Sequence, residues 1–228
     1  DIVIVVVGDN SMRYKWSQKT AGENTARAEL NLAGKQLDLV KKLKETGKKI
    51  IVVYVNGRPV SEPWISENVN AIVKAWEPGS FGGIAAAEII FGKINPSGKL
   101  PLTIASSVGQ LKMFYNHKHS MYFRDYTILN NKPLYSFGFG LSYTKFYISE
   151  PKVNSSKFKD GIISVSVEIK NIGEMTGDEI VQLYISDKYS SITRPVKELK
   201  DFKRIKLKPG ESKSVSYTHL TLPTIYSV

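Results

Sequence analysis

The chain has 228 residues, of which 42 % are hydrophobic, so it can form one large domain or two smaller ones and is not intrinsically disordered. It has no cysteine, which excludes disulfides, thiolate metal sites and a cysteine nucleophile. The net charge of +11 is spread over residues 1–144 (18 basic and 11 acidic) and residues 145–228 (14 and 10), which favours solvated faces over a nucleic-acid groove. The longest apolar run, Ile2 to Val7, is too short to span a membrane.

The first half of the sequence alternates strand-like and helix-like patterns. The β-branched run from Ile2 to Val7 ends in Gly8 and predicts a strand that is covered on both faces. An apolar stripe with helical spacing follows between Ala33 and Leu43, and Gly47 ends that helix. The same reading predicts strands over 50–55 and 71–75 and a small-residue helix over 82–91.

This order of elements predicts an open, mostly parallel α/β sheet with helices on its faces. Ligands bind such sheets at the carboxyl ends of the strands. The loops after Val7, Val55 and Ala75 are therefore the expected place for chemistry.

From about Phe146 the pattern changes to alternation. Apolar and polar residues alternate from Ile163 to Lys170, and further strands are expected over 180–185, 199–202 and 205–207. Short strands at this spacing predict a β-sandwich of immunoglobulin or fibronectin type. The fold class is therefore α/β plus all-β.

Four segments are expected along the chain. Residues 1–112 form an α/β sandwich domain that is incomplete at its N-terminus, and residues 113–145 form an aromatic-rich, ordered connector. Residues 146–216 form a truncated β-sandwich. Residues 217–228 are predicted to be a foreign tail, because Pro223 interrupts the strand pattern there.

Several motifs follow one another in a characteristic order. They include Asn56-Gly-Arg-Pro59, Ala75-Trp-Glu-Pro-Gly79, Asn95-Pro-Ser-Gly-Lys-Leu-Pro101 and Phe137-Gly-Phe-Gly-Leu-Ser-Tyr-Thr144. Together they resemble the C-terminal half of glycoside hydrolase family 3, the family of β-glucosidases and β-xylosidases. Residues 171–184, 194–199 and 207–211 resemble the fibronectin-type-III-like domain of that family, so the resemblance covers about residues 1–215.

The resemblance implies that the chain is a fragment of a retaining β-glycosidase. Family members generally begin with a (β/α)8 barrel, which carries an aspartate nucleophile and has no counterpart in this sequence. The implied activity is hydrolysis of terminal non-reducing β-D-glucosyl residues from an oligosaccharide or an aryl glycoside, with β-xyloside or α-arabinoside as the alternative. Without the barrel the fragment is expected to be inactive, and no cofactor is implied. A periplasmic or secreted location follows by analogy with the family.

The resemblance assigns the general acid/base to Glu23. The order Ala21-Gly-Glu-Asn24, Arg27, Leu30-Asn-Leu32 and Gln36 matches the segment that carries this residue in the family. Glu23 follows the first strand, on the carboxyl-end side of the sheet where ligands are expected to bind. Retaining cleavage needs a second carboxyl group there that protonates the leaving oxygen. The alternative is a surface glutamate that pairs with Arg27. Arg27 could instead orient the carboxylate, although its positive charge would also lower the carboxyl pKa.

Other residues support weaker alternatives. Trp64 and Trp76 could stack on sugar rings, but core packing is the favoured interpretation. Asp9 is interpreted as a turn former and Glu29 as part of a solvated first helical turn. His117 and His119 have no third ligand at a suitable spacing, so no metal site is expected. The rival function is a non-catalytic scaffold or carbohydrate-binding module, which the polar outer face of the sandwich does not favour.

Overall fold

The computed structural model describes residues 1–10, 19–22, 25, 27–118, 125–154, 162–187, 190 and 192–220. These residues fold into two compact units. The first unit comprises the described parts of 1–93, 101–115 and 121–137, and the second comprises those of 94–100, 116–120 and 138–228. The predicted fold class, α/β plus all-β, is confirmed. The predicted boundaries after residues 112, 145 and 216 stay predictions.

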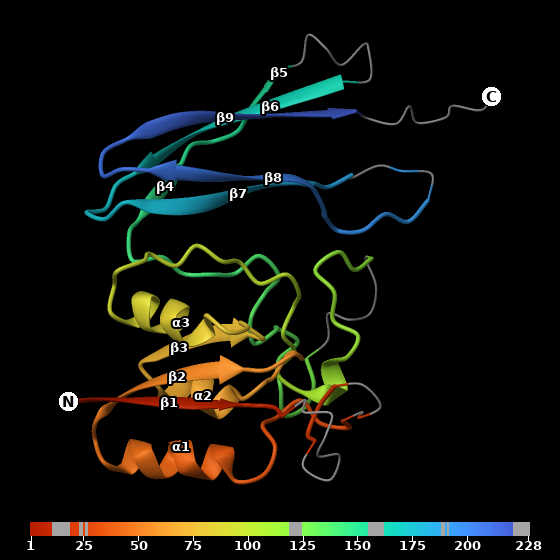
Figure 1. The fold of residues 1–228 in the computed structure, drawn as a ribbon. Helices are drawn as coiled ribbons and strands as arrows, with labels where there is room; N and C mark the ends of the chain where they lie inside the picture. Colours follow the sequence, from red (N-terminus) through yellow and green to blue (C-terminus); the bar gives the residue numbers. More distant parts are fainter. Residues whose placement is uncertain are drawn as a thin grey trace. The chain divides into compact units, whose positions relative to one another are not determined.

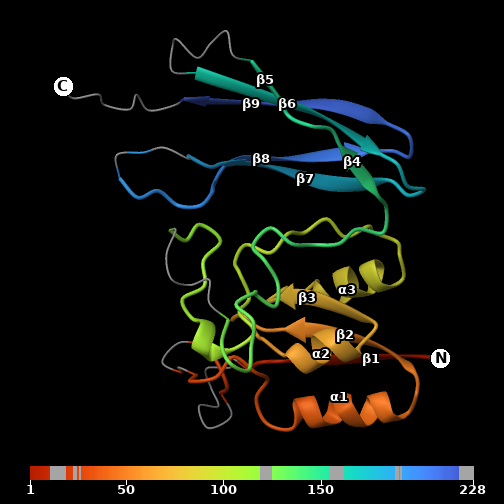
Figure 2. The same ribbon diagram turned by 180° about the vertical axis from the view of Figure 1, so that it is seen from behind.

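The first unit is built on a parallel three-stranded sheet in the order β1-β2-β3 (Figure 1). Its strands are β1 (Ile2–Gly8), β2 (Lys49–Val55) and β3 (Ala71–Trp76). Helix α1 (Gln36–Glu45) covers one face together with the short α2 (Pro63–Asn68), and α3 (Gly82–Ile90) lies on the other (Figure 2). Sequence patterns missed α2, because its six residues are too few to show helical periodicity.

The core of the first unit lies between the sheet and α1. Val40, Ile50, Val52 and Ile65 are fully buried there. The expectation that β1 is covered on both faces is wrong: Ile2, Ile4 and Val6 are exposed by 59 %, 44 % and 63 %. The physical reason is the position of the strand, because β1 lies at one edge of the described sheet and α3 packs beside β3 at the other.

The aromatic-rich stretch after α3 is anchored to the first unit by hydrogen bonds. Gln110 is buried and forms a capping box with Ser107, and its side-chain amide donates to the carbonyls of Asn130 and Lys132. Ile104 and Tyr135 exchange two backbone hydrogen bonds. These hydrogen bonds hold residues 130–135 in the first unit.

The second unit is a sandwich of two antiparallel sheets (Figure 1). One sheet has β6 (Ile162–Asn171) at its centre, with β9 (Ser212–Leu220) on one side and with β4 (Phe146–Ile148) and β5 (Lys152–Asn154) on the other. The other sheet pairs β7 (Gly177–Ile185) with β8 (Glu198–Leu207). The two strands expected over 199–202 and 205–207 are therefore one strand, which pairs with β7 without a shift from Phe202 to Ile205. The exposed, charged Lys203 and Arg204 between them explain the break in the apolar pattern.

The core of the sandwich draws on both sheets. It contains Ile169, Val181, Leu207, Val215 and Tyr217, all less than 8 % exposed. Tyr217 lies in β9, and its hydroxyl donates to the carbonyl oxygen of Val181 over 2.7 Å. Residues 221–228 of the predicted tail lie outside the described residues, and its foreign origin stays a prediction.

Candidate active site

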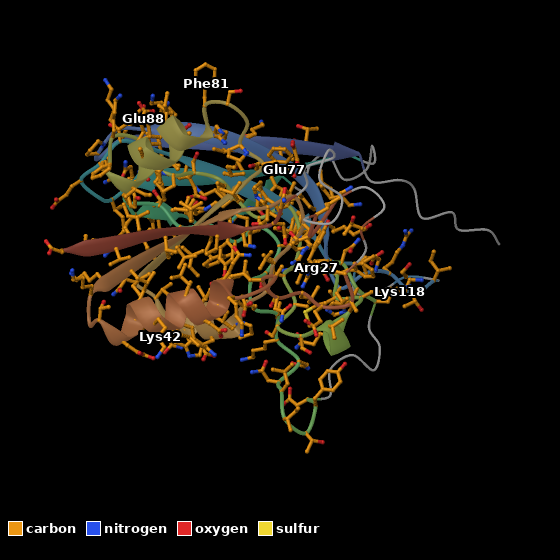
Figure 3. The ribbon with its side chains drawn as sticks, turned by 60° about the horizontal axis from the view of Figure 1, so that its bottom comes forward. Arg27, Lys42, Glu77, Phe81, Glu88 and Lys118 are labelled. Carbon is orange, nitrogen blue, oxygen red and sulfur yellow. The ribbon has the colours of Figure 1, made fainter. Side chains whose placement is uncertain are left out.

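The carboxyl ends of β1, β2 and β3 meet at one edge of the first unit, where the sequence predicts the chemistry. A cavity of about 420 Å³ opens there. Its walls come from Asp9 after β1, from residues 57–59 after β2, from Glu77 after β3 and from the segment between Ala21 and Leu30. Figure 3 shows Arg27 and Glu77 at this end of the sheet. The topology has thus brought four separate segments to one site.

The predicted acid/base, Glu23, lies outside the described residues, so its side chain is not placed. Its described neighbours Gly22, Thr25 and Arg27 line the cavity. Arg27 is half-buried, and Glu29 is exposed at the same cavity. Glu29 is not in a first helical turn as expected, because α1 begins only at Gln36.

Asp9 does more than form a turn. Its side chain is 1 % exposed and makes an ion pair with Arg58, whose side chain is 18 % exposed. The Arg58 Nε lies 2.9 Å from Asp9 Oδ2, and Nη2 donates to Oδ1 over 3.2 Å. Sequence reasoning used Arg58 only as part of a family motif. Its position just after a buried strand was the signal in the sequence that could have indicated a role for Arg58 at the site.

Glu77 is a second cavity residue that sequence reasoning missed. It follows Trp76, whose backbone φ of 55° is unusual for a bulky residue and is the kind of strain found at functional sites. The carboxylate lies against Gly57, where an added Cβ would be only 2.7 Å from Glu77 Oε1. Glycine at position 57 thus permits this close approach, and a larger residue would displace the flexible end of Glu77.

Lys74 lies on β3, within electrostatic range of Asp9 and Arg58, and is half-buried. Burial and, to a smaller extent, the nearby Arg58 cation lower its pKa from the usual 10.5 to about 8, although Asp9 offsets part of this effect. Its Nζ donates to the carbonyl of Val60 over 2.9 Å and stands 4.8 Å from the ring centre of Tyr54. These contacts compensate part of the cost of burying the charge.

Replacing Lys74 by methionine is expected to flatten the pH dependence of stability. Between about pH 8 and 10.5 the unfolded chain keeps the Lys74 proton while the folded chain releases it, so the free energy of unfolding rises with pH. Below pH 8 both states are protonated and this contribution is constant. The wild-type slope should exceed that of Lys74→Met by at most about 1.4 kcal/mol per pH unit.

Urea denaturation at pH 7.5, 8.5 and 9.5 measures these slopes. Lys132→Met, at an exposed lysine, is the control and should follow the wild-type curve. Parallel curves for wild type and Lys74→Met would contradict the lowered pKa.

Other candidates from the sequence have ordinary surroundings. Trp64 packs against the core of the first unit, and Lys41 Nζ lies 5.5 Å from its ring centre. His117 Nδ1 lies 3.0 Å from the carbonyl oxygen of Lys118, and His119 is outside the described residues. Among the described residues, no group of three or more His, Asp, Glu or Cys side chains could hold a metal ion. Nor does any helix in the described ranges have the length and apolarity to cross a bilayer.

Comparison with known proteins identifies the protein families of the α/β unit and of the β-sandwich. The glycosyl hydrolase family 3 C-terminal domain matches residues 1–143, and the fibronectin type III-like domain matches residues 179–220. The chain belongs to glycosyl hydrolase family 3. The resemblance found in the sequence motifs is confirmed.

The relatives include enzymes of two substrate types. A β-xylosidase of Formosa agariphila is 45 % identical over 95 % of this chain and 30 % of its own length. A periplasmic β-glucosidase of Salmonella typhimurium is 40 % identical over 95 % of this chain and 29 % of its own. The chain thus spans less than a third of these relatives.

Solved structures have the same fold. A β-glucosidase from Erythrobacter marinus superposes with a TM-score of 0.87 at 37 % identity, covering 96 % of this chain and 29 % of that one. A β-glucosidase from Listeria innocua in complex with glucose gives 0.84 at 32 % identity, covering 96 % and 31 %.

Proposed function

We propose that the chain is the C-terminal part of a retaining β-glycosidase and that Glu23 is its general acid/base. The observation that supports this most is the cavity at the strand ends, which the residues on both sides of Glu23 line. The order of the motif around Glu23 and the family membership of the chain add to it. Arg27, at the same cavity, would orient the Glu23 carboxyl group.

The chemistry divides between two carboxyl groups about 5–5.5 Å apart in retaining enzymes. In the first step Glu23 protonates the leaving oxygen while a carboxylate attacks the anomeric carbon. In the second step Glu23 removes a proton from the water that hydrolyses the covalent intermediate. We assign the attacking carboxylate to an aspartate in an N-terminal (β/α)8 barrel of the same protein, as the family resemblance implies.

For the substrate we propose terminal β-D-glucosyl residues of oligosaccharides or aryl glycosides. Relatives named as β-glucosidases support glucose, and the Formosa agariphila relative named as a β-xylosidase keeps xylosides as the alternative. The relative named as periplasmic supports a periplasmic or secreted location.

Because the proposed nucleophile lies outside this chain, we expect that the purified chain alone does not hydrolyse an aryl β-glucoside. Protonation of the leaving group without a positioned nucleophile omits the covalent half of the mechanism. Release of p-nitrophenol by the chain alone should equal the buffer blank, whereas the full-length protein at the same concentration should turn over. The p-nitrophenyl β-xyloside measured in parallel decides the sugar preference. Turnover by the chain alone would contradict the proposal.

A further inference from the structure

Arg58 contacts the chain on both sides of the segment that contains Glu23. Its guanidinium makes the ion pair with Asp9 described above, at the end of β1. On the far side of the segment, Nη1 donates to the carbonyl oxygen of Leu30 over 3.0 Å, and Nη2 donates to that of Asn31 over 2.7 Å. One planar group thus holds two positions that are about twenty residues apart in sequence.

Further hydrogen bonds near Asp9 hold the N-terminal side of this segment. The Thr20 backbone N–H donates to the carbonyl of Asn10 over 2.8 Å, and the Asn10 N–H donates to Thr20 Oγ1 over 2.8 Å. The Thr20 hydroxyl also lies 3.4 Å from Asp9 Oδ1. The carboxylate that Arg58 grips therefore also fixes the chain at Thr20, three residues before Glu23.

Arg58 is itself held by the rigid part of the sheet. Asn56 is 2 % exposed; its backbone N–H donates to the carbonyl of Trp76 over 2.9 Å, and its side-chain amide donates to the carbonyl of Arg58. The exit of the segment has a second anchor, because the Ser61 N–H donates to the Leu30 carbonyl over 2.9 Å. The clamp is therefore built on β2 and β3.

We infer that Arg58 is a positioning residue that fixes both flanks of the Glu23 segment and so sets where the general acid stands. This inference rests on the proposed role of Glu23. A guanidinium fork suits the task because it can serve a carboxylate and two carbonyls in one plane, whereas a lysine ammonium is a point donor. A displacement of about 1 Å in a reacting group can cost about a hundredfold in rate.

The test is the leaving-group dependence of the full-length protein carrying Arg58→Lys. The ratio of kcat/KM for a dinitrophenyl glucoside to that for an alkyl glucoside should rise about ten- to a hundredfold, because only the alkyl leaving group needs the proton. Both rates come from one preparation, so the ratio is independent of the folded fraction. A purely structural role would lower both rates equally and leave the ratio unchanged, which would overturn the inference.

Lys99→Met is the matched control. It breaks another largely buried ion pair, in which Lys99 Nζ lies 2.8 Å from Glu179 Oε1 in the second unit, and it should leave the ratio at the wild-type value. If Arg58→Lys does not fold, Thr20→Val removes the hydroxyl links to Asp9 and Asn10 and should shift the ratio in the same direction. An unchanged ratio there would then overturn the inference.

The same ratio separates this inference from the proposed function. If Glu23→Gln does not raise the ratio, the proposed role of Glu23 fails and the role of Arg58 in positioning it fails with it. If Glu23→Gln raises the ratio while Arg58→Lys does not, Glu23 keeps its proposed role and only the inference about Arg58 is wrong.

Discussion

Glu23→Gln in the full-length protein is expected to lower kcat/KM for an alkyl β-glucoside by about 10²- to 10⁴-fold, the usual contribution of a general acid. An alkoxide is a poor leaving group and must be protonated as the glycosidic bond breaks. Dinitrophenolate leaves without a proton, so kcat/KM for that substrate should change little. The loss should therefore grow with the pKa of the leaving alcohol.

The second step of the reaction gives an independent signature. Glutamine cannot remove a proton from water, so the glycosyl-enzyme should accumulate and the dinitrophenyl substrate should show a burst followed by slow turnover. Azide needs no proton removal, and adding it should restore turnover and yield a glycosyl azide. With the alkyl substrate, the fall of activity at alkaline pH that reports the acid should disappear in the variant.

Glu29→Gln is the matched control for this prediction. Glu29 is an exposed carboxylate of the same segment and borders the same cavity. It should keep the wild-type dependence on the leaving group and should not respond to azide. Equal losses with both substrates for Glu23→Gln, or the acid signature at Glu29, would remove Glu23 from the mechanism.

Asn171→Ala is expected to destabilise the second unit by about 3–5 kcal/mol. Asn171 is 0 % exposed, and its side chain uses all of its hydrogen-bonding positions. Oδ1 accepts from the Thr144 hydroxyl at 2.8 Å and from the Gly173 N–H at 3.1 Å, while Nδ2 donates to the carbonyls of Met175 at 2.8 Å and Leu207 at 3.1 Å. Alanine leaves the buried partners, the Thr144 hydroxyl and the Leu207 carbonyl, without a replacement in the interior.

Hydrogen exchange resolved by mass spectrometry measures this effect within one unit. Peptides from β7 and β8 should lose protection in Asn171→Ala, while peptides from β1 and β2 in the first unit should exchange as in the wild type. Asn130→Ala is the control, because Asn130 is exposed and its side chain accepts one local hydrogen bond from Lys132. Unchanged protection in β7 and β8 would show that the Asn171 network adds little stability.

The regular elements were predictable because their patterns are local. A continuous β-branched run gave β1, and the small-residue pattern gave α3 to within one residue. Gly47 stops α1 as expected, since its φ of 72° suits glycine. The errors arise where a pattern is ambiguous: α1 begins at Gln36, three residues after the first stripe residue, and the charged pair Lys203 and Arg204 made β8 look like two strands.

The candidate site was only partly predictable. Motif order pointed to Glu23 and Arg27, and the alternation of strands and helices pointed to the edge of the sheet. Arg58 and Glu77 were visible in the same motifs, but nothing in a linear pattern says that one guanidinium reaches Asp9, 49 residues away, and also two carbonyls 27 and 28 residues away.

By itself, the sequence determined the two kinds of domain, the family and the residue proposed as acid/base, because hydrophobic period and motif order are properties of neighbouring residues. Only the tertiary structure decided which side chains surround the cavity, that Asp9 is a buried ion-pair partner and not a simple turn residue, and that the two flanks of the Glu23 segment share one anchor. The reason is that parallel strands bring their carboxyl ends together across long stretches of chain, and the contacts made there depend on side-chain reach in space.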